Sequence, residues 1–311
     1  MNNLPFCWLD KLSRMDLSTY PYGEIKDVLI ELGKVAFVRK TLHLGKTIYR
    51  GRPHRSFAET FKYKRELSYK PQEFNTTYQR ASTPNKTMFY GCVVPEKLGP
   101  EDLSIGRGTV LSEISSLCRN RAFMGEEKIT FSGWKVIEDI NLAMIIHHQN
   151  YLRQGAEITE LNGKLRMFME GNSPEIVNRT IMISEFMANE FAKSCIRQDY
   201  DYLISAVFAE RLIELGYDGV FYPSVRMDGK GYNIAITPLA ADNKLKLIWA
   251  GESTVYKKEN CILVDDDTHA EVKNQEAEIE YLPSEFGLGR DVMYQQLENC
   301  LEESRTYNRM D

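Results

Sequence analysis

Apolar residues recur along the chain at spacings that predict a mixture of helices and strands. Ile25, Val28 and Leu29 recur at helical spacing, and Gly33 is typical of a residue that ends a helix. The run 88–94 is short, aromatic and β-branched, which is typical of a buried strand. The same reasoning predicts helices at residues 23–32, 109–118, 174–197, 202–215 and 290–303, and strands at residues 46–52, 88–94, 128–134, 218–224, 232–236 and 244–249.

Three stretches between these elements give weaker patterns. Residues 53–77 are polar and aromatic, and they predict a long ordered loop with one short helix. Residues 136–146 are apolar enough for either a buried strand or a short helix, and the pattern does not decide between them. Residues 95–108 are rich in proline and glycine and predict a loop that leads into the helix at 109–118. This places Glu113 near the start of that helix, where its carboxylate can point into a cleft.

Composition and charge narrow the class of protein. The chain of 311 residues is 43% hydrophobic and 27% charged, as in ordinary globular domains. Its net charge of −5 argues against a nucleic-acid-binding protein, because such proteins carry a basic excess. No apolar run approaches the roughly 20 residues that span a membrane, and the N-terminal residues are charged too early for a signal peptide. We therefore expect a cytoplasmic protein that binds neither nucleic acid nor a membrane.

The six cysteines are scattered along the chain, and none of them forms a Cys-x-x-Cys pair. Two of them lie in predicted core elements. Buried, unpaired cysteines of this kind are typical of proteins whose thiols stay reduced. We therefore expect reduced thiols rather than a framework of disulfides.

Sequence motifs for metals and phosphates are incomplete. His147 and His148 have no further ligand at metal-binding spacing. Asp265–Asp267 lacks the glycine and the distal glutamate of a calcium loop, and we interpret it as a solvated acidic loop that opens a polar tail. Gly287-Leu288-Gly289 follows no predicted strand and lacks the third glycine of a dinucleotide fingerprint. The sequence therefore predicts no metal site.

Seven residues instead stand at the ends of predicted elements, where loops converge and binding sites are usually built. Each of them alone is compatible with a structural role. Together they carry coherent chemistry, because arginines bind phosphate oxygens and aromatic rings cover heterocycles. A carboxylate can also stabilise positive charge on a sugar ring as a glycosidic bond breaks. The pattern indicates a candidate nucleotide site made of Arg50, Arg52, Arg80, Tyr90, Glu113, Ser224 and Asn233.

These residues lie in segments that resemble, in the same order, those of the RES-domain family, which is named for its Arg, Glu and Ser. The resemblance covers residues 45–240 and implies an α+β fold with an ADP-ribosyltransferase-like split β-sheet core and flanking helices. We expect this core at residues 45–250, an N-terminal helical extension at 1–44 and a C-terminal extension with a terminal helix at 251–311. The segments are Tyr49-Arg50-Gly51-Arg52, Tyr78-Gln79-Arg80-Ala81-Ser82, Met88-Phe89-Tyr90-Gly91, Leu111-Ser112-Glu113, Tyr217-Asp218-Gly219-Val220-Phe221-Tyr222-Pro223-Ser224 and Gly231-Tyr232-Asn233-Ile234-Ala235.

The resemblance also implies an activity. Members of the family are typically bacterial toxins that cleave NAD+ at the nicotinamide–ribose bond, by hydrolysis or phosphorolysis, and are restrained by a protein antitoxin. Position by position, Arg50, Arg80, Tyr90, Glu113 and Ser224 match the residues of the family. The resemblance implies catalytic roles for Glu113, Arg50 and Ser224. We expect NAD+ binding by Arg50, Arg80, Tyr90 and Ser224, and also by Arg52 and Asn233. Two alternatives stay open. One is an ADP-ribosyltransferase that modifies a macromolecule, and the other is a non-catalytic nucleotide- or partner-binding module on the same fold.

Overall fold

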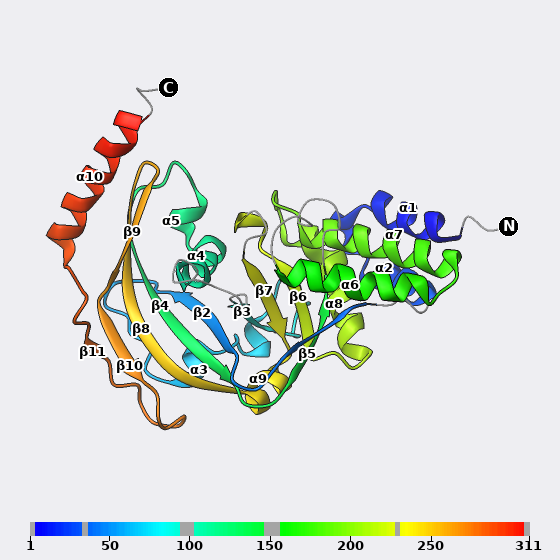
Figure 1. Ribbon diagram of the computed structural model, residues 1–311, viewed down its shortest axis with the longest axis horizontal. Coiled ribbons are helices and arrows are strands. Elements are labelled where there is room, and N and C mark those ends of the chain that lie inside the picture. The colour runs from blue at the N-terminus through cyan, green and yellow to red at the C-terminus, as the bar shows by residue number, and fades with distance from the viewer. Residues whose placement is uncertain (1–3, 33–36, 94–102, 146–155, 228–230, 308–311) are drawn as a thin grey trace.

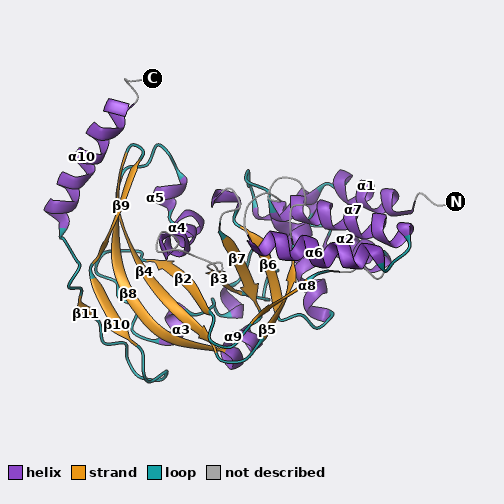
Figure 2. Ribbon diagram, in the orientation of Figure 1, coloured by secondary structure: helices purple, strands orange, loops and turns teal. Residues whose placement is uncertain are grey.

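Helices and strands follow one another along the chain, as Figure 2 shows. The structure is a computed structural model that describes residues 4–32, 37–93, 103–145, 156–227 and 231–307. Its helices are α1 (Leu4–Arg14), α2 (Tyr22–Glu31), α3 (Lys64–Leu67), α4 (Leu103–Ile114), α5 (Ser116–Arg119), α6 (Ala156–Glu170), α7 (Pro174–Phe191), α8 (Leu203–Glu214), α9 (Pro238–Lys244) and α10 (Arg290–Tyr307), with a short 3-10 helix η5 (Val225–Met227) among others. Its strands are β1 (Arg39–Leu42), β2 (Thr47–Pro53), β3 (Phe89–Val93), β4 (Gly125–Val136), β5 (Ile140–Met144), β6 (Gly219–Pro223), β7 (Tyr232–Ile236), β8 (Leu245–Lys258), β9 (Cys261–Asp266), β10 (Thr268–Glu271) and β11 (Leu282–Pro283).

The strands form one curved sheet that is split near its middle (Figure 1). Within the described residues the sheet has 11 strands in the order β1-β5-β6-β7-β3-β2-β4-β8-β10-β11, and β9 pairs with β8. β3 and β7 pair along their whole lengths, and β2 pairs along its whole length with residues 129–135 of β4. β2 and β3 themselves pair only at Ile48–Val93 and Tyr49–Cys92. The two halves of the sheet therefore separate beyond Tyr49, which confirms the predicted α+β fold with a split sheet and flanking helices.

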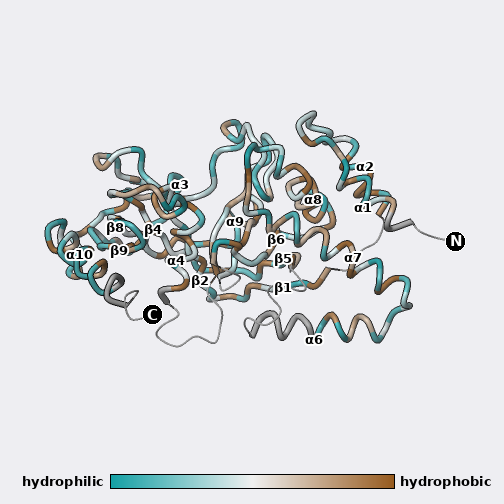
Figure 3. The backbone as a smooth tube through the Cα atoms, turned by 90° about the horizontal axis from the view of Figure 1, so that it is seen from above, coloured by the Kyte–Doolittle hydropathy of each residue, from teal (hydrophilic) through white to brown (hydrophobic). Residues whose placement is uncertain are grey.

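Alternating side chains along each strand divide the sheet between two main cores. On β7, Ile234 and Ile236 pack in one core, whereas Ala235 packs in the other, against α2, α7 and α8. These three helices gather at the end of the sheet formed by β5 to β7 (Figure 1). Figure 3 shows that α8 is hydrophobic along much of its length, in keeping with its burial. Because strand side chains alternate, Asn233 projects from β7 on the same face as Ala235.

The described elements confirm most of the predicted ones and settle the undecided segment. Residues 136–146 contain the strand β5, which pairs with β1 and β6 inside the sheet. The helix predicted at 174–197 ends earlier, at Phe191. There the side chain of Arg80 donates hydrogen bonds to the carbonyl groups of Phe191 and Lys193. His147 and His148 lie outside the described residues.

The helix that carries Glu113 differs from the prediction. α4 begins at Leu103, so the end of the expected loop at 95–108 is helical, while residues 94–102 lie outside the described ranges. The predicted helix at 109–118 is also divided at Ser115, whose side chain accepts a hydrogen bond from the backbone N–H of Cys118 and starts α5. Glu113 is therefore the next-to-last residue of α4, and the prediction that it lies near the start of a helix was wrong.

The residues after 250 continue the sheet. The predicted boundary at residue 250 falls inside β8, and β9 and β10 extend the same sheet. The interpretation of Asp265–Asp267 as a solvated loop was wrong, because Asp265 is only 4% exposed. Its carboxylate accepts hydrogen bonds from the backbone N–H groups of Leu288 and Gly289, at 2.9 and 2.8 Å. These partners come later in the chain and meet the aspartate only in the folded protein.

A disulfide joins Cys261 of β9 to Cys300 of α10. The prediction that the cysteines are reduced was therefore wrong for this pair. Met293, Leu297 and Leu301 pack α10 against the hairpin of β8 and β9, and this packing brings the two thiols together. The spacing of the cysteines in the sequence carries no sign of that contact.

Among the described residues, no helix combines the length and the apolar character that a membrane-spanning helix requires. The same residues contain no group of three or more His, Cys, Asp and Glu side chains placed to hold a metal ion.

Candidate active site

A cleft of about 660 Å³ opens where β2 and β3 separate. Six of the seven candidate residues line it, and the seventh, Ser224, is fully buried behind it. Among the described residues of its wall, Glu113 is the only acid, and it faces a strongly basic surrounding. The basic residues are Arg50, Arg52, Lys70, Arg80, Arg119 and Arg226, and the remaining lining residues are Tyr49, Gly51, Pro53, Gln79, Tyr90, Gly91, Cys92, Val110, Ile114, Tyr202, Tyr222, Asn233 and Ile234.

α4 reaches the cleft because it rests directly on β2. A Cβ atom at Gly51 would lie 2.5 Å from side-chain carbons of both Val110 and Ile114. Only glycine therefore allows this approach of the helix to the strand. The contact holds the last turn of α4, and with it Glu113, over the split in the sheet.

The Glu113 carboxylate is held through one of its two oxygens. Oε1 accepts a hydrogen bond from Ser224 Oγ at 2.7 Å and another from Asn233 Nδ2 at 2.8 Å. No described residue donates a hydrogen bond to Oε2. An anion at the C-terminal end of a helix is unfavourable by about 0.3–1 kcal/mol, because the helix dipole is negative there. The stability of α4 therefore does not explain why a glutamate stands at this position. The two charge-assisted hydrogen bonds offset the cost and fix the carboxylate.

Ser224 and Asn233 are positioned by neighbouring strands. Ser224 follows β6, and its backbone N–H donates to the carbonyl of Gly231 at 2.7 Å, next to the start of β7. Asn233 lies opposite Cys92 in the pairing of β7 with β3. The Cys92 thiol donates to Asn233 Oδ1 at 3.2 Å, which turns the amide nitrogen towards Glu113. Burial raises the pKa of Cys92 strongly, so the thiol keeps its proton at neutral pH.

Arg50 bridges the split in the sheet. Its guanidinium donates to the carbonyl of Tyr90 on the far side, and to the carbonyls of Leu67 at 3.0 Å and Ser68 at 3.1 Å. Burial, and then the charge of Arg52, lower the pKa of Arg50 to about 10, so it remains charged at neutral pH. Arg52 is engaged in the same way, since it donates to the carbonyl of Glu66. Both arginines line the cleft, with part of their hydrogen-bonding capacity already used by the backbone.

Arg80 and Tyr90 are joined through the loop that follows Arg80. Arg80 donates to the carbonyls of Phe191 and Lys193, the latter at 3.1 Å, and so covers the C-terminal end of α7. The Tyr90 hydroxyl contacts Ser82 Oγ at 2.7 Å and accepts from the backbone N–H of Ala81 at 3.1 Å. Burial raises the pKa of Tyr90 to about 12. The tyrosine is thus neutral and serves to hold the loop that carries Arg80.

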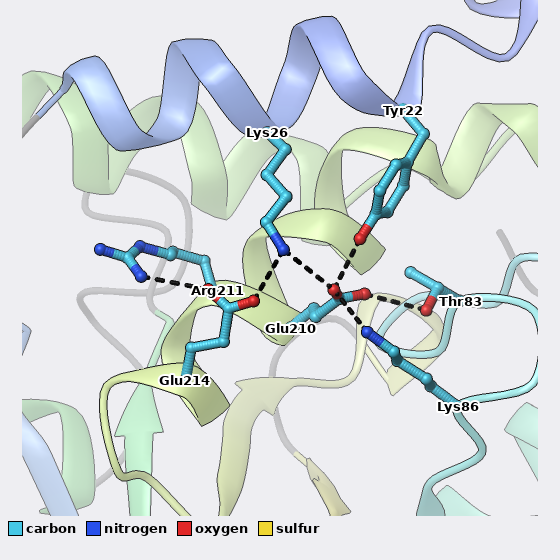
Figure 4. A network of polar contacts seen from close by, with 7 residues as sticks. All are labelled: Tyr22, Lys26, Thr83, Lys86, Glu210, Arg211 and Glu214. Atoms are coloured by element: carbon cyan, nitrogen blue, oxygen red, sulfur yellow. Dashed lines mark hydrogen bonds and ion pairs between the residues drawn. The ribbon is translucent and has the colours of Figure 1, made fainter.

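A buried carboxylate, Glu210 of α8, holds the far end of this loop (Figure 4). It accepts hydrogen bonds from Thr83 at 3.0 Å, Lys86 at 2.7 Å and Tyr22 of α2 at 2.6 Å. Lys26, also from α2, lies 3.6 Å from the same carboxylate. Residues of α2 therefore take part in positioning the loop of Arg80.

Three basic residues of the cleft were missed by the sequence analysis. Lys70 and Arg226 have no hydrogen-bond or ion-pair partner within the described part of the chain, and Arg119 donates only through Nε, to the carbonyl of Ser115 at 3.3 Å. Arg226 lies two residues after the candidate residue Ser224, and this closeness was the feature of the sequence that could have indicated its place in the site. Arg119 and Lys70 lie in segments that resemble no part of the recognised pattern, so only the fold brings them to the cleft.

Comparison with known proteins bears on part of this site. A family model described as the RES domain matches residues 145–251. The match contains Ser224, Arg226 and Asn233, and it ends within β8. No curated protein matches the chain. The structure unites the matched strands with Glu113, Arg50 and Arg80 in a single cleft, and residues 145–251 of the chain are similar to the RES domain.

Proposed function

We propose that the protein is an enzyme that cleaves NAD+ at the bond between nicotinamide and ribose. The observation that carries this proposal is the Glu113 carboxylate, which two donors fix through Oε1 while Oε2 has no donor among the described residues. It stands as the one acid in the described wall of a basic cleft. Such a site combines attraction for an anionic substrate with one negative charge at a defined point. The RES-domain match supports the same reaction.

The cleft suits a dinucleotide in size and charge. Its volume of about 660 Å³ lies within the usual range of small-molecule sites. Guanidinium groups bind phosphate oxygens in pairs, and the exposed Arg226 has its donors free of described partners. We assign the pyrophosphate to Arg80 and Arg226, with Arg50 and Arg52 as the basic floor of the site. Tyr90 and Tyr222 offer ring surfaces for nicotinamide and its ribose.

Glu113 acts on the charge that develops during the reaction. When the bond between the nicotinamide nitrogen and the ribose carbon lengthens, positive charge moves onto the ribose ring. A fixed carboxylate stabilises that charge more in the transition state than in the bound substrate, so its effect falls on kcat. Ser224 and Asn233 contribute by holding the carboxylate in place before substrate arrives, which removes the cost of reorienting it.

The resemblance to RES-domain toxins extends the proposal to the cell. We propose that the protein depletes NAD+ in its host and that a protein antitoxin restrains it. Production of the protein in a bacterial host is expected to stop growth and lower cellular NAD+, and the Glu113→Gln variant is expected to do neither. Normal growth with unchanged NAD+ at good expression of the wild-type protein would contradict the toxin role.

The direct test is incubation of purified protein with NAD+, followed by chromatography of the products. Release of nicotinamide by the wild-type protein, and its absence with Glu113→Gln, is the expected result. Mass spectrometry of the protein and of added cell extract detects ADP-ribose on a macromolecule, which would indicate a transferase instead. Binding of NAD+ without release of nicotinamide would indicate a non-catalytic module.

A further inference from the structure

A second cavity, of about 490 Å³, lies beside α4, and no described residue lines both this cavity and the cleft. Its floor contains Phe131 of β4 and Trp249 of β8, which pack in the same apolar cluster as Val110 of α4. These strands lie next to β10 at one end of the sheet (Figure 1). The volume is within the usual range of small-molecule sites. The protein therefore has a cavity of ligand size that the proposed function does not use.

Two glycines keep the floor of this cavity open. A Cβ atom at Gly133 would lie 2.0, 2.4 and 2.6 Å from the Nε1, Cε2 and Cδ1 atoms of Trp249, so the indole lies flat on β4. Gly251 lies opposite Phe131 in the pairing of β8 with β4 and places no side chain beside that ring. Because Trp249 also lines the cavity, the indole has one face on the strand and the other face turned to the cavity.

A ring of this floor already holds one cation. The guanidinium carbon of Arg107 lies 4.5 Å from the centroid of the Phe131 ring, in the geometry of a cation–π contact. Arg107 also donates to both carboxylate oxygens of Asp266, so these two charges cancel each other within the wall. Phe131 and Asp266 are therefore engaged, whereas the cavity face of Trp249 is not covered in this way.

The other ionisable residues of the wall are Glu271, Glu285 and His269. The wall is therefore acidic whether or not His269 carries a proton. Glu271 lies opposite Trp249 in the pairing of β10 with β8, and such neighbours project from the same face of a sheet roughly 5 Å apart. Lys273 lies 3.3 Å from Glu271, but both side chains are largely exposed, and an exposed ion pair of this kind is weak.

We propose that this cavity binds a small planar organic cation, of the size of a pyridinium ring, which stacks on the open face of Trp249 beside Glu271. An indole face attracts cations more strongly than other aromatic rings do, and the acidic wall adds to that attraction. Phe286 stands in the wall with 81% of its surface exposed, and a bound ring would cover it. The basic cleft, in contrast, repels such a cation. The proposal does not depend on NAD+ cleavage.

The first test compares three probes that share one ring. 1-Methylnicotinamide carries a positive charge, nicotinamide is neutral and nicotinate is negative. Isothermal titration calorimetry of the wild-type protein with each probe, up to about 10 mM, should give the tightest binding for 1-methylnicotinamide, about tenfold tighter than for nicotinamide. Nicotinate should bind most weakly. Equal affinities for the three probes, or no detectable binding of 1-methylnicotinamide, would overturn the proposal.

The second test locates the bound cation. Glu271→Gln is expected to weaken the binding of 1-methylnicotinamide by about threefold and to leave that of nicotinamide unchanged. Glu280→Gln is the matched control, since Glu280 is exposed and does not line the cavity. Glu113→Gln, which removes the acid of the cleft, should also leave the affinity unchanged. Weaker binding in Glu113→Gln together with wild-type affinity in Glu271→Gln would place the cation in the cleft and refute the assignment.

The third test removes the ring. Trp249→Leu is expected to lower the affinity for 1-methylnicotinamide by about tenfold or more. If this variant does not fold, the double variant Glu271→Gln/Glu285→Gln takes its place, because both of these side chains are exposed. Its affinity should fall by about tenfold. Wild-type affinity in a folded Trp249→Leu protein, or in the double variant, would show that the cation binds elsewhere.

Discussion

The hydroxyl of Ser224 lies 2.7 Å from Oε1 of Glu113, although 111 residues separate them in the chain. Asn233 donates to the same oxygen at 2.8 Å. The ends of β6 and α4 and the middle of β7 therefore meet at one carboxylate oxygen. The other oxygen accepts no hydrogen bond from a described residue.

Replacing Glu113 by glutamine removes the charge and keeps the shape. We expect kcat for NAD+ cleavage to fall by about 100-fold or more, as for the loss of other electrostatic stabilisers. The melting temperature should change little, because relief of the unfavourable charge at the C-terminal end of α4 is offset by the weakening of the two charge-assisted hydrogen bonds. Glu31→Gln is the matched control, since Glu31 is the last residue of α2 and is exposed. Turnover close to wild type in a folded Glu113→Gln protein would contradict the mechanism.

Ser224 and Asn233 should act through the same group. Ser224→Ala and Asn233→Ala each remove one charge-assisted hydrogen bond and are expected to lower kcat by about 10- to 100-fold. The double variant should lose less than the product of the two single effects, because both donors serve Oε1 of Glu113. Kinetics of the four proteins measure the coupling. Effects that multiply in full would show that the two residues act independently.

The arginines of the cleft should divide into two classes. Arg50→Lys is expected to lower the free energy of unfolding by about 1–3 kcal/mol, because lysine cannot serve the three carbonyl groups that Arg50 binds. Arg226 is exposed and has no described partner, so Arg226→Ala should raise KM for NAD+ by about tenfold and leave the melting temperature unchanged. Denaturant titration and steady-state kinetics of both variants check this, and the reverse pattern would refute the assignment.

Glu210 should make stability depend on pH in the acid range. Burial raises the pKa of this carboxyl group, but hydrogen bonds from Lys86, Tyr22 and Thr83 outweigh it and hold the pKa below its usual value of 4.5. A depressed pKa in the folded state contributes stability that is present above 4.5 and is lost as the pH falls through the folded value. Urea unfolding from pH 7 to pH 3 should therefore show a steeper loss for the wild-type protein than for Glu210→Gln. Equal slopes would show that the network does not stabilise the charged form.

Much of the secondary structure could be predicted because each strand has its own short apolar run and each helix its own periodicity. The positions of Arg50 and Arg80 could also be predicted, because each lies where an apolar run meets a polar segment. What the pattern could not give is the partner of each side chain. Nothing near Arg50 in the sequence shows that its guanidinium binds carbonyl groups of Leu67, Ser68 and Tyr90, because these come from two other places in the chain.

The position of Glu113 in its helix shows a second limit of prediction from the sequence. A single helix was predicted at residues 109–118, but Ser115 follows the end of one helix and caps the next. A side chain that caps a helix and one that lies within it give the same apolar spacing, so the break is invisible in the pattern. Cys92 and Arg226 were missed for a related reason, since a thiol in an apolar strand and an arginine in a polar turn are each common in structural roles.

The position of the Glu113 carboxylate also depends on Gly51, a residue that takes no part in the proposed chemistry. A methyl group there would act as a wedge between β2 and α4, and it would lift the carboxylate away from its two donors while every reactive group stayed in the protein. Under the proposed function, Gly51→Ala would thus keep every reactive group of the site but misalign the carboxylate. Such an inactive variant would allow the protein to be produced in quantity and the proposed antitoxin to be captured with it from living cells.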